Sequence, residues 1–83
     1  MYCVYALRLT GIKDKRLYVG YTSNLKVRLL QHKLGEVETT KNKNPKLIYY
    51  ETYINKSLAL KREKGIKSSG SVYNALIKRL GLK

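Results

Sequence analysis

The sequence predicts an α/β fold of the α+β sandwich kind: a three-stranded, mainly antiparallel sheet with flanking helices, in the order ββαβαα. Three short stretches rich in aromatic and β-branched residues are typical of strands. Three other segments follow Asn or Ser residues that can cap a helix. With 83 residues, the chain is expected to form one domain, residues 1–83, with a modest core.

The first two strands are expected at residues 2–9 and 16–22, joined by a polar turn at residues 10–15. This arrangement predicts an antiparallel hairpin.

Alternation along the second strand places Tyr18 and Gly20 on one face, and Leu17, Val19 and Tyr21 on the other. A glycine inside a strand usually marks a bulge or a close backbone approach. Gly20 could therefore leave room for a ligand phosphate beside Tyr18, or it could be purely structural.

The remaining elements follow from caps and stops. A helix is predicted at residues 25–34, capped by Ser23 or Asn24 and stopped by Gly35, and a polar loop follows at 36–45. The later part of the chain predicts a strand at 46–54, a helix at 56–67 after Asn55, a break at 68–71, and a helix at 72–80 capped by Ser71 and ended by Gly81.

Positive charge dominates the composition, with 18 Lys and Arg against 5 Asp and Glu, a formal net charge of +13. This excess favours a polyanionic partner, and DNA is the expected one, with RNA as the alternative. An anionic membrane surface is the competing interpretation, but no predicted helix is strongly basic on one face and apolar on the other. No membrane partner is expected, and the protein is expected to be a monomer or a weak dimer.

The single cysteine, Cys3, allows neither an intrachain disulfide nor a zinc cluster built from thiols. No stretch approaches the roughly 18 apolar residues of a membrane span, and the N-terminus does not resemble a signal peptide. These features indicate a cytoplasmic, nucleoid-associated protein.

Glu63 is an acid on an otherwise apolar helix face. At about 100° per residue, Ala59, Glu63 and Ile66 lie within one stripe that is expected to face the core. A buried carboxylate is costly unless it is paired or binds a cation. Glu63 is therefore either a metal-binding or catalytic residue, or one half of an internal ion pair.

The first helix also carries polar residues beside apolar ones. Arg28 and His32 are i, i+4 neighbours next to Leu25 and Leu29, so they could point over the sheet. A second apolar group lies on roughly the opposite side of this helix, formed by Val27, Leu30 and Leu34. The helical wheel leaves open which side is buried.

Taken together, these residues resemble the GIY-YIG nuclease family, in its small single-domain bacterial form, similar to the nuclease module of an excision-repair endonuclease. Residues 3–5 (Cys-Val-Tyr) stand in the place of the Gly-Ile-Tyr motif, and residues 18–20 (Tyr-Val-Gly) in that of Tyr-Ile-Gly. The family's Arg and its His or Tyr fall on Arg28 and His32, and its glutamate on Glu63. Three positions depart from the family or are not assigned: Cys3 replaces Gly, Tyr21 replaces the Lys of the repair enzymes, and Asn74 has too poor a local match to be assigned.

The resemblance implies a metal-dependent endonuclease that hydrolyses phosphodiester bonds in DNA. One Mg²⁺ or Mn²⁺ ion would be held by Glu63, Tyr5 or Tyr18 would act as general base, Arg28 would hold the phosphate, and His32 would accept a proton or orient water. The alternative is a nucleic-acid-binding module of the same fold with little or no catalytic activity. Contacts to the nucleic-acid backbone are expected from Lys26, Lys41, Lys43, Lys46 and Arg62.

Overall fold

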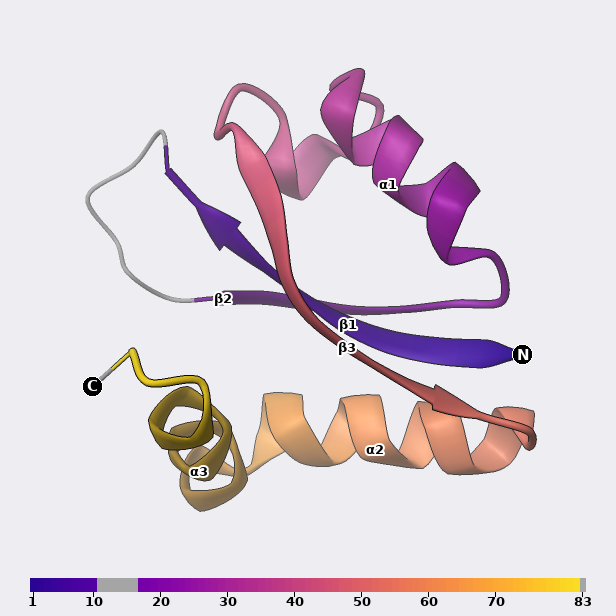
Figure 1. Cartoon of the computed structure of the whole chain (residues 1–83), viewed down its shortest axis with the longest axis vertical. Helices are drawn as coiled ribbons and strands as arrows, with labels where there is room; N and C mark the ends of the chain where they lie inside the picture. Colours follow the sequence, from indigo (N-terminus) through magenta and orange to yellow (C-terminus); the bar gives the residue numbers. More distant parts are fainter. Residues whose placement is uncertain (11–16, 83) are drawn as a thin grey trace.

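A three-stranded antiparallel sheet in the order β2-β1-β3 runs through the middle of the protein (Figure 1). The computed structural model describes residues 1–10 and 17–82. The elements are β1 (Tyr2–Leu9), β2 (Leu17–Thr22), α1 (Leu25–Lys33), the 3-10 helix η1 (Glu38–Thr40), β3 (Pro45–Tyr53), α2 (Lys56–Ser68) and α3 (Gly70–Arg79). The predicted order ββαβαα and the antiparallel sheet are confirmed.

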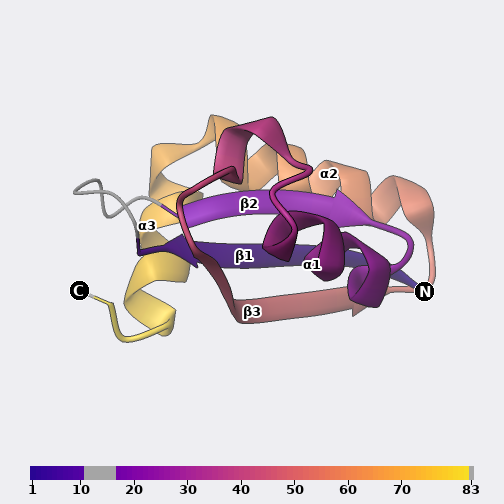
Figure 2. The same ribbon diagram turned by 90° about the horizontal axis from the view of Figure 1, so that it is seen from above.

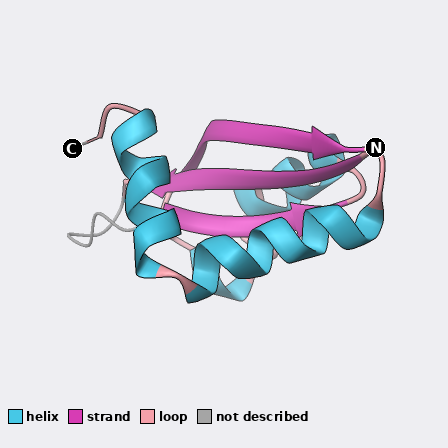
Figure 3. Ribbon diagram, turned by 90° about the horizontal axis from the view of Figure 1, so that it is seen from below, coloured by secondary structure: helices cyan, strands magenta, loops and turns pink. Residues whose placement is uncertain are grey.

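The helices cover both faces of the sheet. Helix α1 and the segment after it lie on one face, in front of the strands in Figure 2. Helices α2 and α3 lie on the other face, in front of the strands in Figure 3. The central strand β1 pairs with β2 on one side and β3 on the other, and is buried from Cys3 to Leu7.

The predicted boundaries need three corrections. Ser69, not Ser71, caps the last helix: its hydroxyl accepts a hydrogen bond from the Val72 amide at 3.4 Å, so α3 already begins at Gly70. Helix α2 continues to Ser68, so the predicted four-residue break shrinks to Ser69 alone. The loop after α1 contains η1, and β3 begins one residue earlier than predicted.

Several predicted caps are confirmed, and one prediction cannot be compared. Of the two candidates before α1, Asn24 is the cap, because its side chain accepts from the Val27 amide. Gly35 and Gly81 have φ values of 74° and 71°, in the left-handed region that terminates helices. The predicted turn beyond Thr10 and the start of the second strand at Arg16 lie outside the described residues.

The apolar core lies between the sheet and the α2–α3 layer. Val4 and Val19 from the strands pack with Ala59, Ile66 and Leu76 from the two helices. The predicted buried stripe of α2 is therefore confirmed at Ala59 and Ile66, on either side of Glu63.

The orientation of α1 settles the question that the wheel left open. His32 is buried, with 2% of its surface exposed, and Leu25, Arg28 and Leu29 are half-buried. The other apolar group is largely exposed, at 50–62%: Val27, Leu30 and Leu34. The polar pair Arg28 and His32 thus faces the sheet.

Gly20 of β2 lies directly beside Tyr5 of β1. The two residues are paired in register, and a Cβ atom at Gly20 would lie 2.5 Å from both Cζ and Oη of Tyr5. The suggestion that this glycine leaves room for a ligand phosphate is wrong, because the Tyr5 ring fills that space. Gly20 is required for close approach of a side chain within the protein.

We expect Gly20→Ala to destabilise the protein by about 2 kcal/mol, since the methyl group would overpack against a buried aromatic ring. Gly65→Ala is the matched control: a Cβ there meets nothing within 4 Å, and the helix position favours alanine over glycine. Urea unfolding of both variants measures the difference. A Gly20→Ala protein as stable as the wild type would refute the close packing of Tyr5 against β2.

Candidate functional site

A chain of buried hydrogen bonds starts at Tyr5, in the middle of the sheet. The Tyr5 Oη atom lies 2.8 Å from Nε2 of His32, and Nδ1 of His32 lies 2.7 Å from Oγ1 of Thr40. The Thr40 hydroxyl donates to the Val37 carbonyl at 3.4 Å. Tyr5, His32 and Thr40 are each at most 2% exposed. The chain therefore ties β1, α1 and η1 together away from water.

The two ends of this chain fix the direction of its hydrogen bonds. The Val37 carbonyl can only accept, so Thr40 uses its hydrogen there and accepts from Nδ1–H of His32. At the other end, Arg28 Nε donates to Tyr5 Oη at 3.4 Å, which leaves the Tyr5 hydrogen for His32 Nε2. Both ends thus indicate the same arrangement: a neutral His32 protonated on Nδ1, which accepts from Tyr5.

The electrostatics of the cluster agree with this assignment. Burial lowers the pKa of His32, and the positive charge of Arg28 lowers it further. Burial also raises the pKa of Tyr5 to about 12, although the hydrogen bond from Arg28 acts in the opposite direction. At neutral pH, His32 and Tyr5 are therefore both uncharged, and Nε2 of His32 accepts the hydrogen bond from Tyr5.

Tyr18 and Arg28 complete the part of the cluster that reaches the surface. The Tyr18 ring lies edge-on to His32, with centroids 5.1 Å apart, and 6.2 Å from the Tyr5 ring. The pKa of Arg28 is raised, first by its hydrogen bond to Tyr5 and to a smaller extent by Tyr18. Both Tyr18 and Arg28 are half-buried, so they are the members of this group that a bound molecule could touch.

Glu63 lies on α2, the helix on the other face of the sheet, and does not contact this cluster directly. Its side chain is 21% exposed, and its Oε2 atom lies 3.3 Å from Nζ of Lys67, one turn further along α2. The same Lys67 ammonium lies 5.9 Å from the centroid of the Tyr18 ring. Glu63 is thus not at the centre of the core face, as the wheel had placed it. It lies at the partly exposed edge of the buried face of α2. Lys67 contacts both the Glu63 carboxylate and the Tyr18 ring.

An open hollow of about 600 Å³ lies where β2 meets the junction of α2 and α3. Tyr18 and Lys67 both line it, together with Thr39, Ser69 and Tyr73. The structure therefore brings Tyr5, Tyr18, Arg28 and His32 into one cluster. Lys67 lies between this cluster and Glu63.

The five predicted backbone contacts lie on separate parts of the surface. Lys26, Lys41 and Lys46 are exposed, and Lys43 is half-buried. Arg62 is half-buried and forms an ion pair with Glu51, with 2.7 Å between Nε and Oε1. Arg62 is thus held in place, unlike the exposed lysines.

Three further polar residues have defined partners in the structure but were not predicted as site residues: Thr40, Lys67 and Glu51. Nothing in the polar loop around Thr40 distinguishes it, and Lys67 is one of many lysines. Glu51 could have been found, because Tyr49 and Tyr53 flank it at i−2 and i+2 on the same strand face. Both tyrosines donate to its carboxylate at 2.7 Å.

Glu63 has the ion-pair partner that was its alternative prediction, Lys67, but at the surface; Glu51 is the acid with several partly buried partners. Burial acts to raise the pKa of Glu51, but the hydrogen bonds from Tyr53, Arg62 and Tyr49 outweigh it and lower the pKa below its ordinary value. This cluster lies on the α2–α3 face of the sheet.

Glu63, the candidate metal ligand, would bind a metal as the one protein carboxylate at its position among the described residues. In the part of the chain that the structure describes, no three His, Cys, Asp or Glu side chains gather at one point.

None of the described helices combines the length and apolar character needed to cross a membrane.

Comparison with known proteins identifies the family. The family model of the GIY-YIG catalytic domain matches residues 1–74. A UPF0213 protein of Oceanobacillus iheyensis is 41% identical over 66 residues, which cover 77% of this chain and 73% of that protein. A UPF0213 protein of Staphylococcus haemolyticus is 41% identical over 58 residues, covering 68% and 71%. One from Natronomonas pharaonis is 40% identical over 57 residues, covering 66% and 67%.

No solved structure matches the chain. The family match spans both tyrosine motifs, α1 and the whole of α2, and so includes every residue of the cluster. The chain therefore belongs to the GIY-YIG family and carries a nuclease-type domain of the class that cleaves nucleic acids.

Proposed function

We propose that the protein is a metal-dependent endonuclease that hydrolyses phosphodiester bonds in DNA. The observation that carries this proposal is the directed hydrogen-bond chain from Arg28 through Tyr5 to His32, next to the accessible ring of Tyr18. This chain orients a guanidinium beside an accessible phenol, and hydrolysis of a phosphodiester can use both groups, one to bind the phosphate and one to act as base.

Tyr18 is the better candidate for the general base. The Tyr5 hydroxyl is fully buried and already bonded to His32 and Arg28, so it has no free position for the attacking water. Tyr18 lines the open hollow, and its ring lies near the cationic Lys67. Tyr18 can take a proton from water only after it has lost its own proton to solvent, and cations on this side would stabilise that phenolate until it becomes neutral again.

Arg28 is positioned to bind the phosphate. Its Nε is fixed by Tyr5, and one terminal nitrogen donates to Oε1 of Gln31 at 3.1 Å. The guanidinium plane is thereby oriented before substrate binds, which lowers the entropy cost of a two-pronged contact with phosphate oxygens. In this scheme Tyr5 and His32 are positioning residues: Tyr5 holds Arg28 by a hydrogen bond, and the His32 ring packs against Tyr18.

Glu63 fits the requirements for a Mg²⁺ or Mn²⁺ ligand. Magnesium sites commonly use one or two carboxylates, with water and substrate phosphate oxygens as the other ligands. The ammonium of Lys67 contacts Glu63 and lies near Tyr18, so a positive charge beside this carboxylate is compatible with the local packing, which supports the proposal. A bound ion would supply Lewis-acid stabilisation of the charge on the phosphate and on the leaving 3′ oxygen.

The formal charge of +13 supports a nucleic acid as the substrate, since neutralising phosphates releases counterions. DNA is proposed as the main substrate and RNA as the alternative.

Glu63→Gln should reduce metal-dependent nicking of plasmid DNA by about 100-fold or more, because a neutral amide is a poor ligand for a hard cation. Glu36→Gln is the matched control: it removes the same charge from an exposed loop position and should cleave at the wild-type rate. Rates are measured with Mg²⁺ and with Mn²⁺.

A wild-type protein that binds DNA but cleaves no duplex, single-stranded or branched substrate with either metal would favour the non-catalytic binding module. Equal loss of activity in the Glu63 and Glu36 variants would remove Glu63 from the proposed site.

The stability of the fold should depend on pH through His32. Its pKa is below 6.5 in the folded protein, so the unfolded chain binds the proton more readily. The free energy of unfolding should therefore be constant just above pH 6.5 and fall as the pH drops below it, by at most about 1.4 kcal/mol per pH unit. Urea unfolding between about pH 7.5 and pH 5 measures this slope, and cleavage should decline over the same range.

His32→Gln serves as the control, because His32 is the only histidine and carboxylates titrate at lower pH. The variant should lack the slope, whatever its absolute stability. An unchanged slope in His32→Gln would contradict the assignment of a neutral, buried His32.

A further inference from the structure

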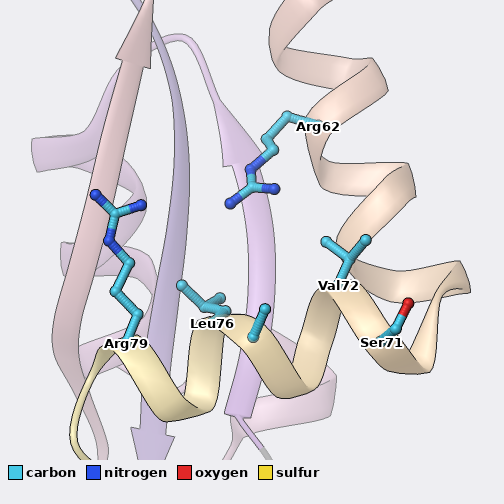
Figure 4. A pocket seen from close by; sticks show the side chains of 6 residues that line it. Arg62, Ser71, Val72, Leu76 and Arg79 are labelled. Atoms are coloured by element: carbon cyan, nitrogen blue, oxygen red, sulfur yellow. The ribbon is translucent and has the colours of Figure 1, made fainter.

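A second hollow lies on the face of the sheet opposite Tyr5, between α2 and α3 (Figure 4). Its volume is about 320 Å³, and it is lined by Arg62, Ser71, Val72, Ala75, Leu76 and Arg79. Two guanidinium groups thus border a hollow that the proposed catalytic cluster does not use.

Arg62 is fixed on one side only. Its Nε donates to Glu51 at 2.7 Å, and the Glu51 carboxylate is held in turn by the hydroxyls of Tyr49 and Tyr53. Arg62 also lines the hollow, and Figure 4 shows its guanidinium extending from α2 toward the sheet, above α3 in this view. The guanidinium is therefore oriented by Glu51, and its terminal nitrogens have no hydrogen-bond partner among the residues that the structure describes.

Arg79 approaches the same hollow from the end of α3. Residues 72, 75, 76 and 79 follow the i, i+3, i+4, i+7 spacing of one helix face. Arg79 is therefore on the same face of α3 as the apolar residues Val72, Ala75 and Leu76 that line the hollow. Figure 4 shows its guanidinium on the same side of α3 as that of Arg62. Within residues 1–10 and 17–82, Arg79 forms no ion pair.

The charges around the hollow do not cancel. Arg62 and Arg79 contribute two positive charges, and Glu51 contributes one negative charge whose oxygens are already bonded to Tyr49, Tyr53 and Arg62. The pKa of Tyr49 is raised, chiefly by its hydrogen bond to Glu51, and the Arg79 charge acts against this rise, so Arg79 lies within electrostatic reach of the cluster. The surplus is positive, and an anion between the two arginines would balance it.

We propose that this hollow, the Arg62–Arg79 site, binds a phosphodiester group of a nucleic acid. The proposal rests on the proposed function for the class of ligand, and a chain of charge +13 favours a polyanion over an isolated acidic side chain. The site lies on the α2–α3 face of the sheet, whereas Tyr5 is bonded to Arg28 and His32 of α1 on the other face (Figure 1). Short duplexes are stiff, so the phosphate comes from a stretch of nucleic acid distinct from the one at the Tyr5 cluster.

The decisive variant is Arg79→Gln, because Arg79 is exposed and takes no part in the Glu51 cluster's hydrogen bonds. Binding of a fluorescent DNA duplex is measured without divalent ions, so that cleavage does not interfere. We expect the Kd to rise about three- to tenfold, as for loss of one charge-assisted hydrogen bond partly exposed to water. The slope of log Kd against log salt should fall by about 0.9, as for one phosphate contact.

Lys78→Gln is the matched control: it removes the same charge from the neighbouring exposed position of the same helix, which does not line the hollow. Its Kd should stay within about twofold of the wild type. Equal losses in the two variants would show a general charge effect and overturn the Arg62–Arg79 site, while leaving the nuclease proposal intact. A wild-type protein that binds no DNA would instead refute the proposed function itself, and this site with it.

Nitrogen-15 NMR of the arginine side chains provides an independent readout that does not depend on overall affinity. The Nε–H signals of Arg62 and Arg79 should both shift on addition of inorganic phosphate and of the duplex. Shifts with polyglutamate but not with phosphate or DNA would identify an acidic protein as the ligand and overturn the proposal. Signals that respond to none of the three would also overturn it.

Discussion

The buried hydroxyl of Tyr5 is the constraint on which the α1 side of the protein depends. The chain contains eight Tyr and no Phe, so a polar group accompanies each aromatic ring into the interior. An unsatisfied hydroxyl at that depth would cost about 1–3 kcal/mol, and His32 removes this cost by accepting its hydrogen. His32 then needs a partner for its second nitrogen, and Thr40 supplies it. A single buried oxygen thereby fixes the position of α1 and of η1 over the sheet.

On each face of the sheet, tyrosine hydroxyls have a hydrogen-bond partner within the protein, but the partner differs between the two faces. On the α1 face, a neutral chain through His32 satisfies Tyr5. On the α2–α3 face, the hydroxyls of Tyr49 and Tyr53 satisfy the charged carboxylate of Glu51. Among the described residues, no buried side-chain nitrogen or oxygen lacks a hydrogen-bond partner. Such fully satisfied networks define a unique arrangement, which suits a small domain whose apolar core is limited.

The fold could be predicted from the sequence because strand alternation, helix caps and stop signals are local. The order of elements, the Asn24 and Asn55 caps and the Gly35 stop all depend on neighbouring residues alone. The site could be predicted only in part. The wheel could not choose between the two sides of α1, because that choice depends on Tyr5, 27 residues before His32. Likewise, the clash that requires Gly20 depends on register with β1, which no local pattern of β2 contains.

The same limit applies to the two acids of this layer: Glu63 has an ion-pair partner at the surface, Lys67, whereas Glu51 is the acid with several partly buried partners. A helical wheel assigns Glu63 to a buried stripe, but a glutamate side chain is long enough to leave that stripe at the sheet edge, where Lys67 meets it. The Glu63–Lys67 contact is an i, i+4 pair whose lysine is 51% exposed. Pairs of this kind contribute about 0.3–0.5 kcal/mol, so a divalent ion could displace the lysine at little cost. Glu51, by contrast, is already saturated by Tyr49, Tyr53 and Arg62. Of these two acids, Glu63 is therefore the one whose carboxylate remains available to a metal.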